Sequence, residues 1–134
     1  MKKILAISFC LISLSLKSQS ADETIGQLIN NGDYVELGRK FPGLRDKMQV
    51  PFLKVMADAL VYSSQNQWTE ANKCLEDLIT NYQTEIGFDN VINMINLWGL
   101  NLILLCEYDA AANILGSFIS QKYPMKPILY CIFR

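Results

Sequence analysis

Three stretches decide the fold: Asn31-Gly32-Asp33-Tyr34-Val35-Glu36-Leu37, Asn66-Gln67-Trp68-Thr69-Glu70-Ala71 and Cys106-Glu107-Tyr108-Asp109-Ala110-Ala111. Each contains an aromatic residue, and a small or apolar residue follows three places on. The aromatics Tyr34, Trp68 and Tyr108 are 34 and 40 residues apart. Similarity at such a period is typical of stacked helical hairpins. The sequence therefore predicts an all-α scaffold, of a kind that usually binds a partner rather than catalyses a reaction.

Hydrophobic periodicity and turn residues predict about five or six helices in antiparallel hairpins. A short polar connector such as Gln65-Asn66-Gln67 makes the helices on either side antiparallel neighbours. Asp33 and Asp89 are candidate N-caps, and Pro42-Gly43 should stop the second helix. Pro51 should either kink the third helix or form its first turn. The predicted helices span residues 21–31, 34–41, 44–64, 68–82, 90–106 and 108–121.

Two of the hairpins resemble tetratricopeptide repeats. Small residues on the first helix precede an aromatic and a small residue on the second: Ala59 precedes Trp68 and Ala71, and Gly99 precedes Tyr108 and Ala111. The resemblance implies that the small side chains let the helices approach, while the ring fills the gap between them. The longer second period and the missing closing proline depart from the family pattern. An unrelated bundle of helical hairpins is the alternative.

Residues 1–20 have the order of a secretory signal peptide. Met1-Lys2-Lys3 is cationic, residues 4–16 are mostly apolar, and Ser18-Gln19-Ser20 offers small residues for cleavage before Ala21. The apolar run is too short to span a bilayer comfortably. We therefore expect export to the periplasm, the outer envelope or the extracellular space, and a mature chain that begins at Ala21.

The charge pattern excludes several classes of function. Without Lys2, Lys3 and Lys17, nine basic residues face thirteen acidic ones, a net charge of −4. There is no basic stripe, so nucleic acid is not an expected partner. The chain has no histidine, which removes the commonest metal ligand and the usual proton carrier near neutral pH. We expect no metal, no cofactor and no catalytic residue, and we interpret Glu76-Asp77 and the Glu107/Asp109 pair as solvated surface charges.

Residues 90–106 contain no charge and could be mistaken for a membrane helix. The run is short for that purpose, and its asparagines are costly in hydrocarbon. We predict instead the most buried helix of the bundle, and no transmembrane helix after signal cleavage. The candidate partner-binding residues are Asn90, Asn93, Asn96 and Asn101, which fall within roughly 140° of one another on a helix. Amides on the concave face of a solenoid can bind peptides; the alternative is a polar side that is simply solvated.

Cys74, Cys106 and Cys131 remain after signal cleavage. An oxidising compartment would allow one disulfide among them. The alternative is that Cys74 and Cys106 are small apolar residues filling helix faces. Large apolar residues at helical spacing usually lie in a core, so we expect Trp68 and Trp98 there rather than stacked on a ligand.

The helical domain should span residues 21–121, because residues 122–134 break its pattern. Pro124 and Pro127 forbid a smooth helix. Residues 128–133 form an apolar run without helical alternation. We expect an irregular segment that is a truncated or altered end of a longer protein.

A second resemblance is carried by Ile25-Gly26-Gln27-Leu28-Ile29, residues 46–60 and residues 82–91. These segments are similar to the helical N-terminal region of exported retropepsin-like aspartic proteases of Bacteroides-type bacteria. The resemblance implies a prodomain or accessory domain ahead of a β-rich protease domain. Aspartic proteases need a carboxylate beside Thr-Gly or Ser-Gly. Neither Asp-Thr-Gly nor Asp-Ser-Gly occurs in the chain, so no catalytic residue is carried over.

These observations favour a non-catalytic domain that binds a protein or peptide partner, possibly a protease domain. Two alternatives stay open. One is an aspartic endopeptidase whose catalytic domain is missing from this sequence. The other is a free-standing adaptor of the cell envelope.

Overall fold

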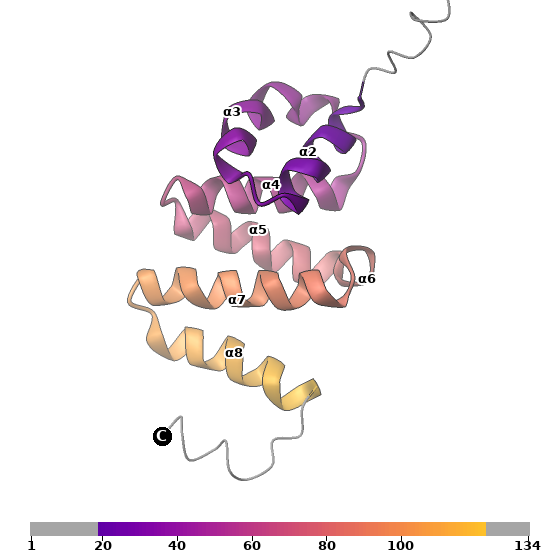
Figure 1. Ribbon diagram of the computed structural model, residues 1–134. Coiled ribbons are helices and arrows are strands. Elements are labelled where there is room, and N and C mark those ends of the chain that lie inside the picture. Colours follow the sequence, from indigo (N-terminus) through magenta and orange to yellow (C-terminus); the bar gives the residue numbers. More distant parts are fainter. Residues whose placement is uncertain (1–18, 123–134) are drawn as a thin grey trace, which may run out of the picture.

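The computed structural model describes residues 19–122, with side chains through residue 117. All regular structure in that range is helical, which confirms the all-α prediction. The elements are α2 (Ala21–Asn30), α3 (Tyr34–Leu44), the short 3-10 helix η1 (Arg45–Lys47), α4 (Pro51–Ser64), α5 (Trp68–Asn81), α6 (Gln83–Ile86), α7 (Phe88–Leu104) and α8 (Tyr108–Lys122). The hairpins α2–α3, α4–α5 and α7–α8 follow one another along the molecule (Figure 1). Nearly all of the predicted signal peptide and tail lies outside the described residues.

The same backbone turn reverses the chain in all three hairpins. Gly32, Asn66 and Cys106 have φ angles of 68°, 60° and 60°. The backbone N–H of the next residue donates to the carbonyl five residues before it: Asp33 to Leu28 (3.0 Å), Gln67 to Tyr62 (2.9 Å) and Glu107 to Leu102 (2.8 Å). This pattern is the Schellman motif of helix C-termini. The repeated phrase of the sequence therefore marks the turn, and its aromatic is the first residue of the second helix.

Because the three turns are alike, corresponding positions meet across each hairpin. These positions lie seven residues before the left-handed residue, and five and nine residues after it. They are occupied by Ile25, Leu37 and Phe41, by Ala59, Ala71 and Leu75, and by Gly99, Ala111 and Leu115. Eight of the nine are buried and Leu115 is half-buried. In the second and third hairpins the first two positions hold only Ala or Gly, so the helix axes can approach closely.

Gly99 shows how close the approach is. A Cβ atom on Gly99 would lie 2.9 Å from Cγ, Cδ1 and Cδ2 of Leu115. A side chain there would have to displace the whole branched end of that leucine. The expectation that small residues let the helices nest is confirmed by this contact and by the burial of Ala59, Ala71 and Ala111.

The expectation that a ring fills the gap between the helices is wrong for Tyr108, and the equivalent ring of the first phrase, Tyr34, is exposed as well. Tyr34 is 45% exposed and Tyr108 is 61% exposed, while Trp68 is half-buried. The reason is their place at the first position of each helix. Helical side chains tilt toward the N-terminus, so these rings lie over the turn instead of between the helices. Trp98, by contrast, packs against the core as predicted.

Some helix boundaries also differ from the prediction. Helix α3 continues through Pro42 to Leu44, since a proline near the end of a helix removes only one backbone bond before the chain leaves it. Pro51 is the first residue of α4, which settles the two alternatives for that proline. Helix α6 is too short to produce a periodic pattern and is absent from the prediction.

Two predicted N-caps have different outcomes. Asp33 caps α3 as expected, because its carboxylate accepts a bond from the backbone N–H of Glu36 at 3.2 Å. Asp89 does not cap α7, because that helix already begins at Phe88. Gly87 is the residue before it, and its φ of 77° is one that glycine adopts without strain.

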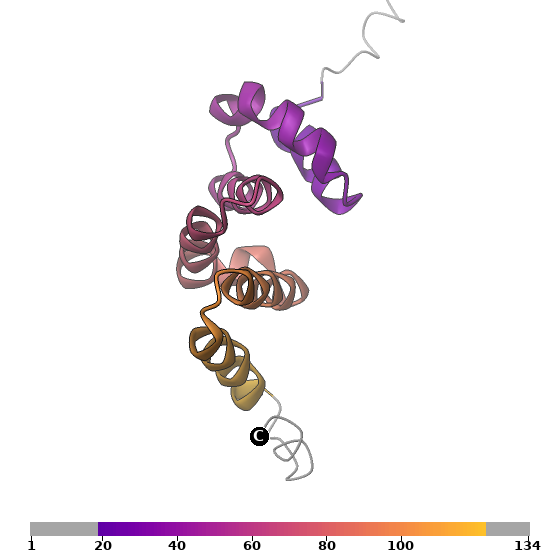
Figure 2. The same ribbon diagram turned by 90° about the vertical axis from the view of Figure 1, so that its left-hand side faces the viewer.

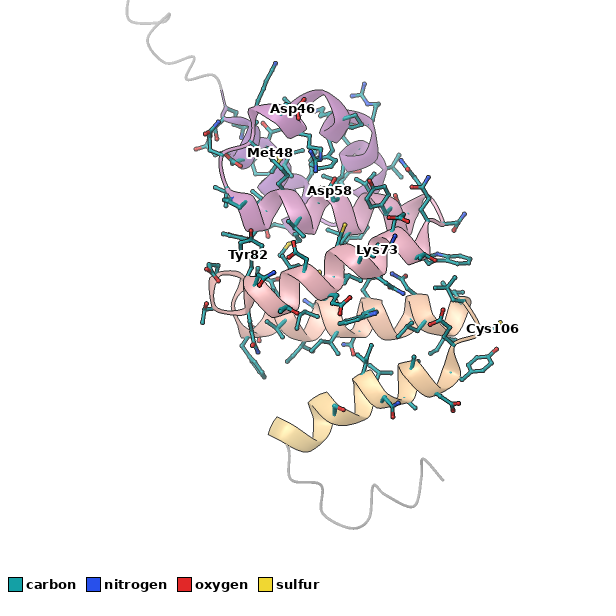
Figure 3. The ribbon with its side chains drawn as sticks, turned by 180° about the vertical axis from the view of Figure 1, so that it is seen from behind. Asp46, Met48, Asp58, Lys73, Tyr82 and Cys106 are labelled. Atoms are coloured by element: carbon teal, nitrogen blue, oxygen red, sulfur yellow. The ribbon has the colours of Figure 1, made fainter. Side chains whose placement is uncertain are left out.

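Polar contacts fasten the first hairpin to α4. Asp22 of α2 accepts bonds from the backbone N–H groups of Gln49 (3.0 Å) and Val50 (3.2 Å), so it holds the two residues that precede α4 against α2. The Arg45 guanidinium forms a bidentate pair with the Asp58 carboxylate, with Nε–Oδ1 at 3.0 Å and Nη2–Oδ2 at 2.9 Å. Figure 3 shows Asp58 on α4 with Met48 nearby. Met48 is buried, so apolar packing accompanies these contacts.

Gly99→Ala should destabilise the domain, because the added methyl group collides with Leu115. We expect the free energy of unfolding to fall by about 1–3 kcal/mol, less the gain in helix propensity. Gly116→Ala is the matched control, since a Cβ there meets nothing within 4 Å. Its stability should rise by roughly 0.5–1 kcal/mol. Urea unfolding followed by circular dichroism measures both, and equal gains in the two variants would contradict a close approach at Gly99.

Cys106→Gly should stabilise the domain, because Cys106 holds a φ of 60° that a residue with a Cβ adopts at a cost. After allowing for the more flexible unfolded chain, we expect a gain of about 0.5–1 kcal/mol. Gly32→Ala is the reciprocal change at the equivalent position and should lose a similar amount. Thermal unfolding of both variants checks the pair. Unchanged or lower stability of Cys106→Gly would show that the turn is unstrained.

Candidate functional site

A groove of about 770 Å³ lies between the first hairpin, α4 and α7. Figure 2 shows the hairpins following an arc, with α5 on its outer side and α4 and α7 toward its inner side. The lining residues come from the end of α2 and the turn after it, from the first residue of α3, from α4, and from α7 between Asn90 and Leu97. They are Ile29, Asn30, Asn31, Gly32, Tyr34, Met56, Leu60, Ser63, Ser64, Asn90, Asn93, Met94 and Leu97.

The groove has an apolar floor and a polar rim. Met56, Leu60 and Met94 are buried and form the floor. Methionine adapts its shape to irregular partners, so two methionines make this floor tolerant of different side chains. Around it stand four asparagines, two serines and the ring of Tyr34, most of them exposed. Such a lining combines an apolar surface with amides that both donate and accept hydrogen bonds.

Several rim amides are available to a ligand. Within residues 19–122, no side-chain hydrogen bond engages the amides of Asn30, Asn31 or Asn93. The Asn90 amide is partly used, because its Nδ2 donates to the Ile86 carbonyl at 2.8 Å. The Ser64 hydroxyl is also used, since it donates to the Val61 carbonyl at 2.7 Å. Among the described residues, Asn93 is therefore the α7 amide that lines the groove without a side-chain hydrogen bond.

The structure separates the four asparagines that the sequence grouped on one face of α7. Asn90 and Asn93 line the groove. Asn96 is exposed but lies outside the groove lining. Asn101 is only 1% exposed, and its Nδ2 donates to the Ser63 hydroxyl at 3.1 Å. Asn101 thus joins α7 to α4 inside the domain, and cannot contact a partner without local opening.

Sequence reasoning missed the first hairpin's share of the groove. By composition Asn30, Asn31 and Gly32 are a helix stop, because asparagine and glycine tolerate left-handed backbone angles, and Tyr34 is the aromatic of the first repeated phrase. The structure places all four along the groove. A signal was present, because two adjacent asparagines at a turn expose two amides together. However, the turn lies opposite α7 because of tertiary packing, and a local sequence pattern does not predict such packing.

The groove carries no charge among its described lining residues, and the shifted pKa values belong to groups elsewhere. Hydrogen bonds from Arg39 and then Lys40 lower the pKa of Glu36 to about 2. The hydrogen bond to Asp58 raises the pKa of Arg45. Burial raises the pKa of the Cys74 thiol. Acid–base chemistry would need an ionisable group at the groove. The described lining residues include no carboxylate, amine or thiol side chain.

The other candidate groups are scattered. Glu76, Glu107 and Asp109 are exposed, as predicted for surface charges, and Asp77 is half-buried and accepts a bond from Asn81. Among residues 19–122, no three Cys, Asp or Glu side chains converge on a possible metal position. Over the same residues, no helix combines the length and apolar character needed to cross a bilayer.

Cys74 and Cys106 are not joined by a disulfide. Cys74 is half-buried and packs against the core, as predicted for a small apolar residue. The same prediction is wrong for Cys106, which is exposed at the left-handed position of the α7–α8 turn. Figure 3 shows it at the edge of the molecule. Cys131 lies outside the described residues.

The chain matches no family model, no curated protein and no solved structure.

Asn101→Ala should lower stability, because it removes a buried hydrogen bond between α7 and α4 and leaves a small cavity. We expect a loss of about 1–3 kcal/mol in the free energy of unfolding. Asn96→Ala changes the same residue type on the same helix where it is exposed, and should stay within about 0.5 kcal/mol of the wild type. Urea unfolding measures both variants. A loss no larger for Asn101→Ala than for Asn96→Ala would refute the internal role.

Proposed function

We propose that the chain is a non-catalytic interaction domain that binds an extended, uncharged peptide segment of a partner protein in the groove. One observation carries the proposal: unpaired amides stand around an apolar floor that has no charged neighbour in its lining. An extended peptide exposes backbone N–H and C=O groups that such amides can pair, and alternate side chains that an apolar floor can accept. Pockets of this kind, mostly apolar with a few placed polar groups, are typical of binding sites.

The lack of charge in the groove lining also indicates which kind of peptide would bind there. An acidic or basic side chain entering the groove would lose water without gaining a counter-ion, and that costs free energy. Aliphatic side chains on the partner would fill the space above Met56, Leu60 and Met94. We therefore infer a preference for segments with aliphatic residues at alternate positions and no charge between them.

The nature of the partner is a further proposal, motivated by the sequence resemblance. Residues 25–29, 46–60 and 82–91 are similar to the N-terminal region of exported retropepsin-like aspartic proteases. On that basis the domain would act as an accessory region that holds or shields a protease domain, in the periplasm, the outer envelope or outside the cell. Reading the gene beyond Arg134 tests this: a downstream Asp-Thr-Gly supports it, whereas a stop codon favours a free-standing adaptor. Peptidase activity of the purified chain that pepstatin inhibits would overturn the non-catalytic assignment.

Peptides selected from a random dodecapeptide display library on the purified full chain test the groove. The enriched sequences should be aliphatic and uncharged, and Asn93→Ala should weaken the best of them by about three- to tenfold, the effect of one or two lost hydrogen bonds. Fluorescence anisotropy with the labelled synthetic peptide measures the affinity.

Asn96→Ala is the control for this measurement, because it removes the same exposed amide one turn further along α7, outside the groove. Its affinity should equal that of the wild type. If both substitutions left binding unchanged, or if charged peptides were enriched, the groove would not be the binding site.

A further inference from the structure

Two adjacent serines at the end of α4 line the groove, and their hydroxyl groups are engaged in opposite ways. The Ser63 hydroxyl oxygen accepts a bond from Nδ2 of the buried Asn101 at 3.1 Å. The Ser64 hydroxyl donates to the Val61 carbonyl, three residues before it on the same helix, at 2.7 Å. Neither Asn101 nor Val61 lines the groove, and each serine keeps the rest of its hydrogen-bonding capacity for a ligand.

The remaining capacities of the two hydroxyls are complementary. A hydroxyl has one hydrogen to donate and two lone pairs that accept. Ser64 uses its hydrogen inside its own helix, so it can offer a ligand only lone pairs. Ser63 uses a lone pair, and in the part of the chain that the structure describes its hydrogen has no acceptor. The two serines therefore present an acceptor beside a donor.

This pair fits a ligand group that accepts and donates along one edge. A side-chain carboxamide does both, because its C=O accepts and its N–H donates. A carboxylate only accepts, and would set an oxygen against the lone pairs of Ser64. A protonated amine only donates, and the described groove lining has no negative charge to balance it. The uncharged carboxamide is the group that the serines match.

The serines also continue the row of α4 side chains that forms the groove floor. Met56, Leu60 and Ser64 are four residues apart, which places them along one side of the helix at intervals of about 6 Å. In an extended peptide, alternate side chains point the same way at intervals of roughly 6.6 Å. Three alternate side chains of one peptide can therefore reach three successive turns of α4.

We propose that Ser63 and Ser64 bind the side-chain carboxamide of an asparagine or glutamine in the partner peptide. Ser63 donates to the carboxamide oxygen, and Ser64 accepts from the carboxamide N–H. Aliphatic side chains two and four residues away in the same peptide lie above Leu60 and Met56. The inference rests on the function proposed for the groove, and it adds a sequence requirement: two alternate aliphatic residues, with the carboxamide residue at the next alternate position.

The peptides enriched on the purified full chain test this requirement, because they should carry Asn or Gln two residues from an aliphatic position. In the tightest-binding peptide, methionine in place of that residue should weaken binding about tenfold, since two hydrogen bonds are lost. Glutamate or aspartate of matching length should weaken it by more than about tenfold, since a carboxylate cannot donate to Ser64. Fluorescence anisotropy measures the affinities. Enriched peptides without Asn or Gln at that position, or equal affinity for the acidic peptide, would overturn the proposal.

Ser64→Ala locates the contact, because it removes an exposed hydroxyl that bonds only within its own helix. The variant should bind the carboxamide peptide about threefold more weakly and the methionine peptide as tightly as the wild type does, so the two changes are not additive. Gln65→Ala is the matched control, since Gln65 is the next residue, is exposed and lies outside the groove lining. It should leave both affinities unchanged.

Asn93→Ala separates this inference from the function on which it rests. Asn93 lines the groove from α7, so its loss should weaken the carboxamide and methionine peptides by the same factor. If Asn93→Ala weakened binding while Ser64→Ala had no effect, or an equal effect on both peptides, the groove would bind peptides and the carboxamide site would be wrong. If no enriched peptide depended on Asn93, the groove would not be the binding site, and the inference would be overturned with it.

Discussion

The left-handed backbone at Gly32, Asn66 and Cys106 is the constraint on which the rest of the structure depends. Each of these residues closes a Schellman turn, and the turn fixes the register between the helices on either side. Once the register is fixed, the same three positions face inward in every hairpin. Small residues there permit the close approach in the second and third hairpins. In the first hairpin the same positions hold Ile25, Leu37 and Phe41, so the same turn joins helices whose facing side chains are larger.

The groove depends on how the first hairpin is attached to this stack. One wall is the turn at Gly32 and the other is α7, and α4 lies between them. Asp22 holds the beginning of α4 against α2, and the Arg45–Asp58 pair holds the chain between α3 and α4 to the middle of α4. Three charged residues thus position an uncharged site without entering it. A bidentate Arg–carboxylate pair is the geometrically specific kind of ion pair, which suits this role.

Local pattern was enough to predict much of the fold. The recurring phrases gave the hairpins, and Asp33 was recognisable as a cap because capping acts within one turn of chain. The contacts that could not be predicted join segments distant in sequence, which local patterns do not report. Asp22 accepts bonds from backbone N–H groups 27 and 28 residues later, and the hydrogen bond between Asn101 and Ser63 spans 38 positions. Tyr34 and Tyr108 were misread for a different reason: helical periodicity does not show that a first-turn side chain points back over its turn. Asn90 and Asn93 could be proposed from the sequence because they share one helix. The amides that face them across the groove could not, because they come from a distant segment of the chain.

The cap at the beginning of α2 includes residues at the cleavage site that the sequence predicts. The Ser20 hydroxyl accepts a bond from the Glu23 N–H, and the Glu23 carboxylate accepts one from the Ser20 N–H. A leader removed after Ser20 would take this reciprocal pair away and leave the protonated amine of Ala21 where the helix dipole is already positive. A scissile bond two residues earlier would spare both partners. The position of the cleaved bond would then determine how stable the first turn of α2 is. Because Asp22 lies in that turn, it would also affect how firmly the residues before α4 are held.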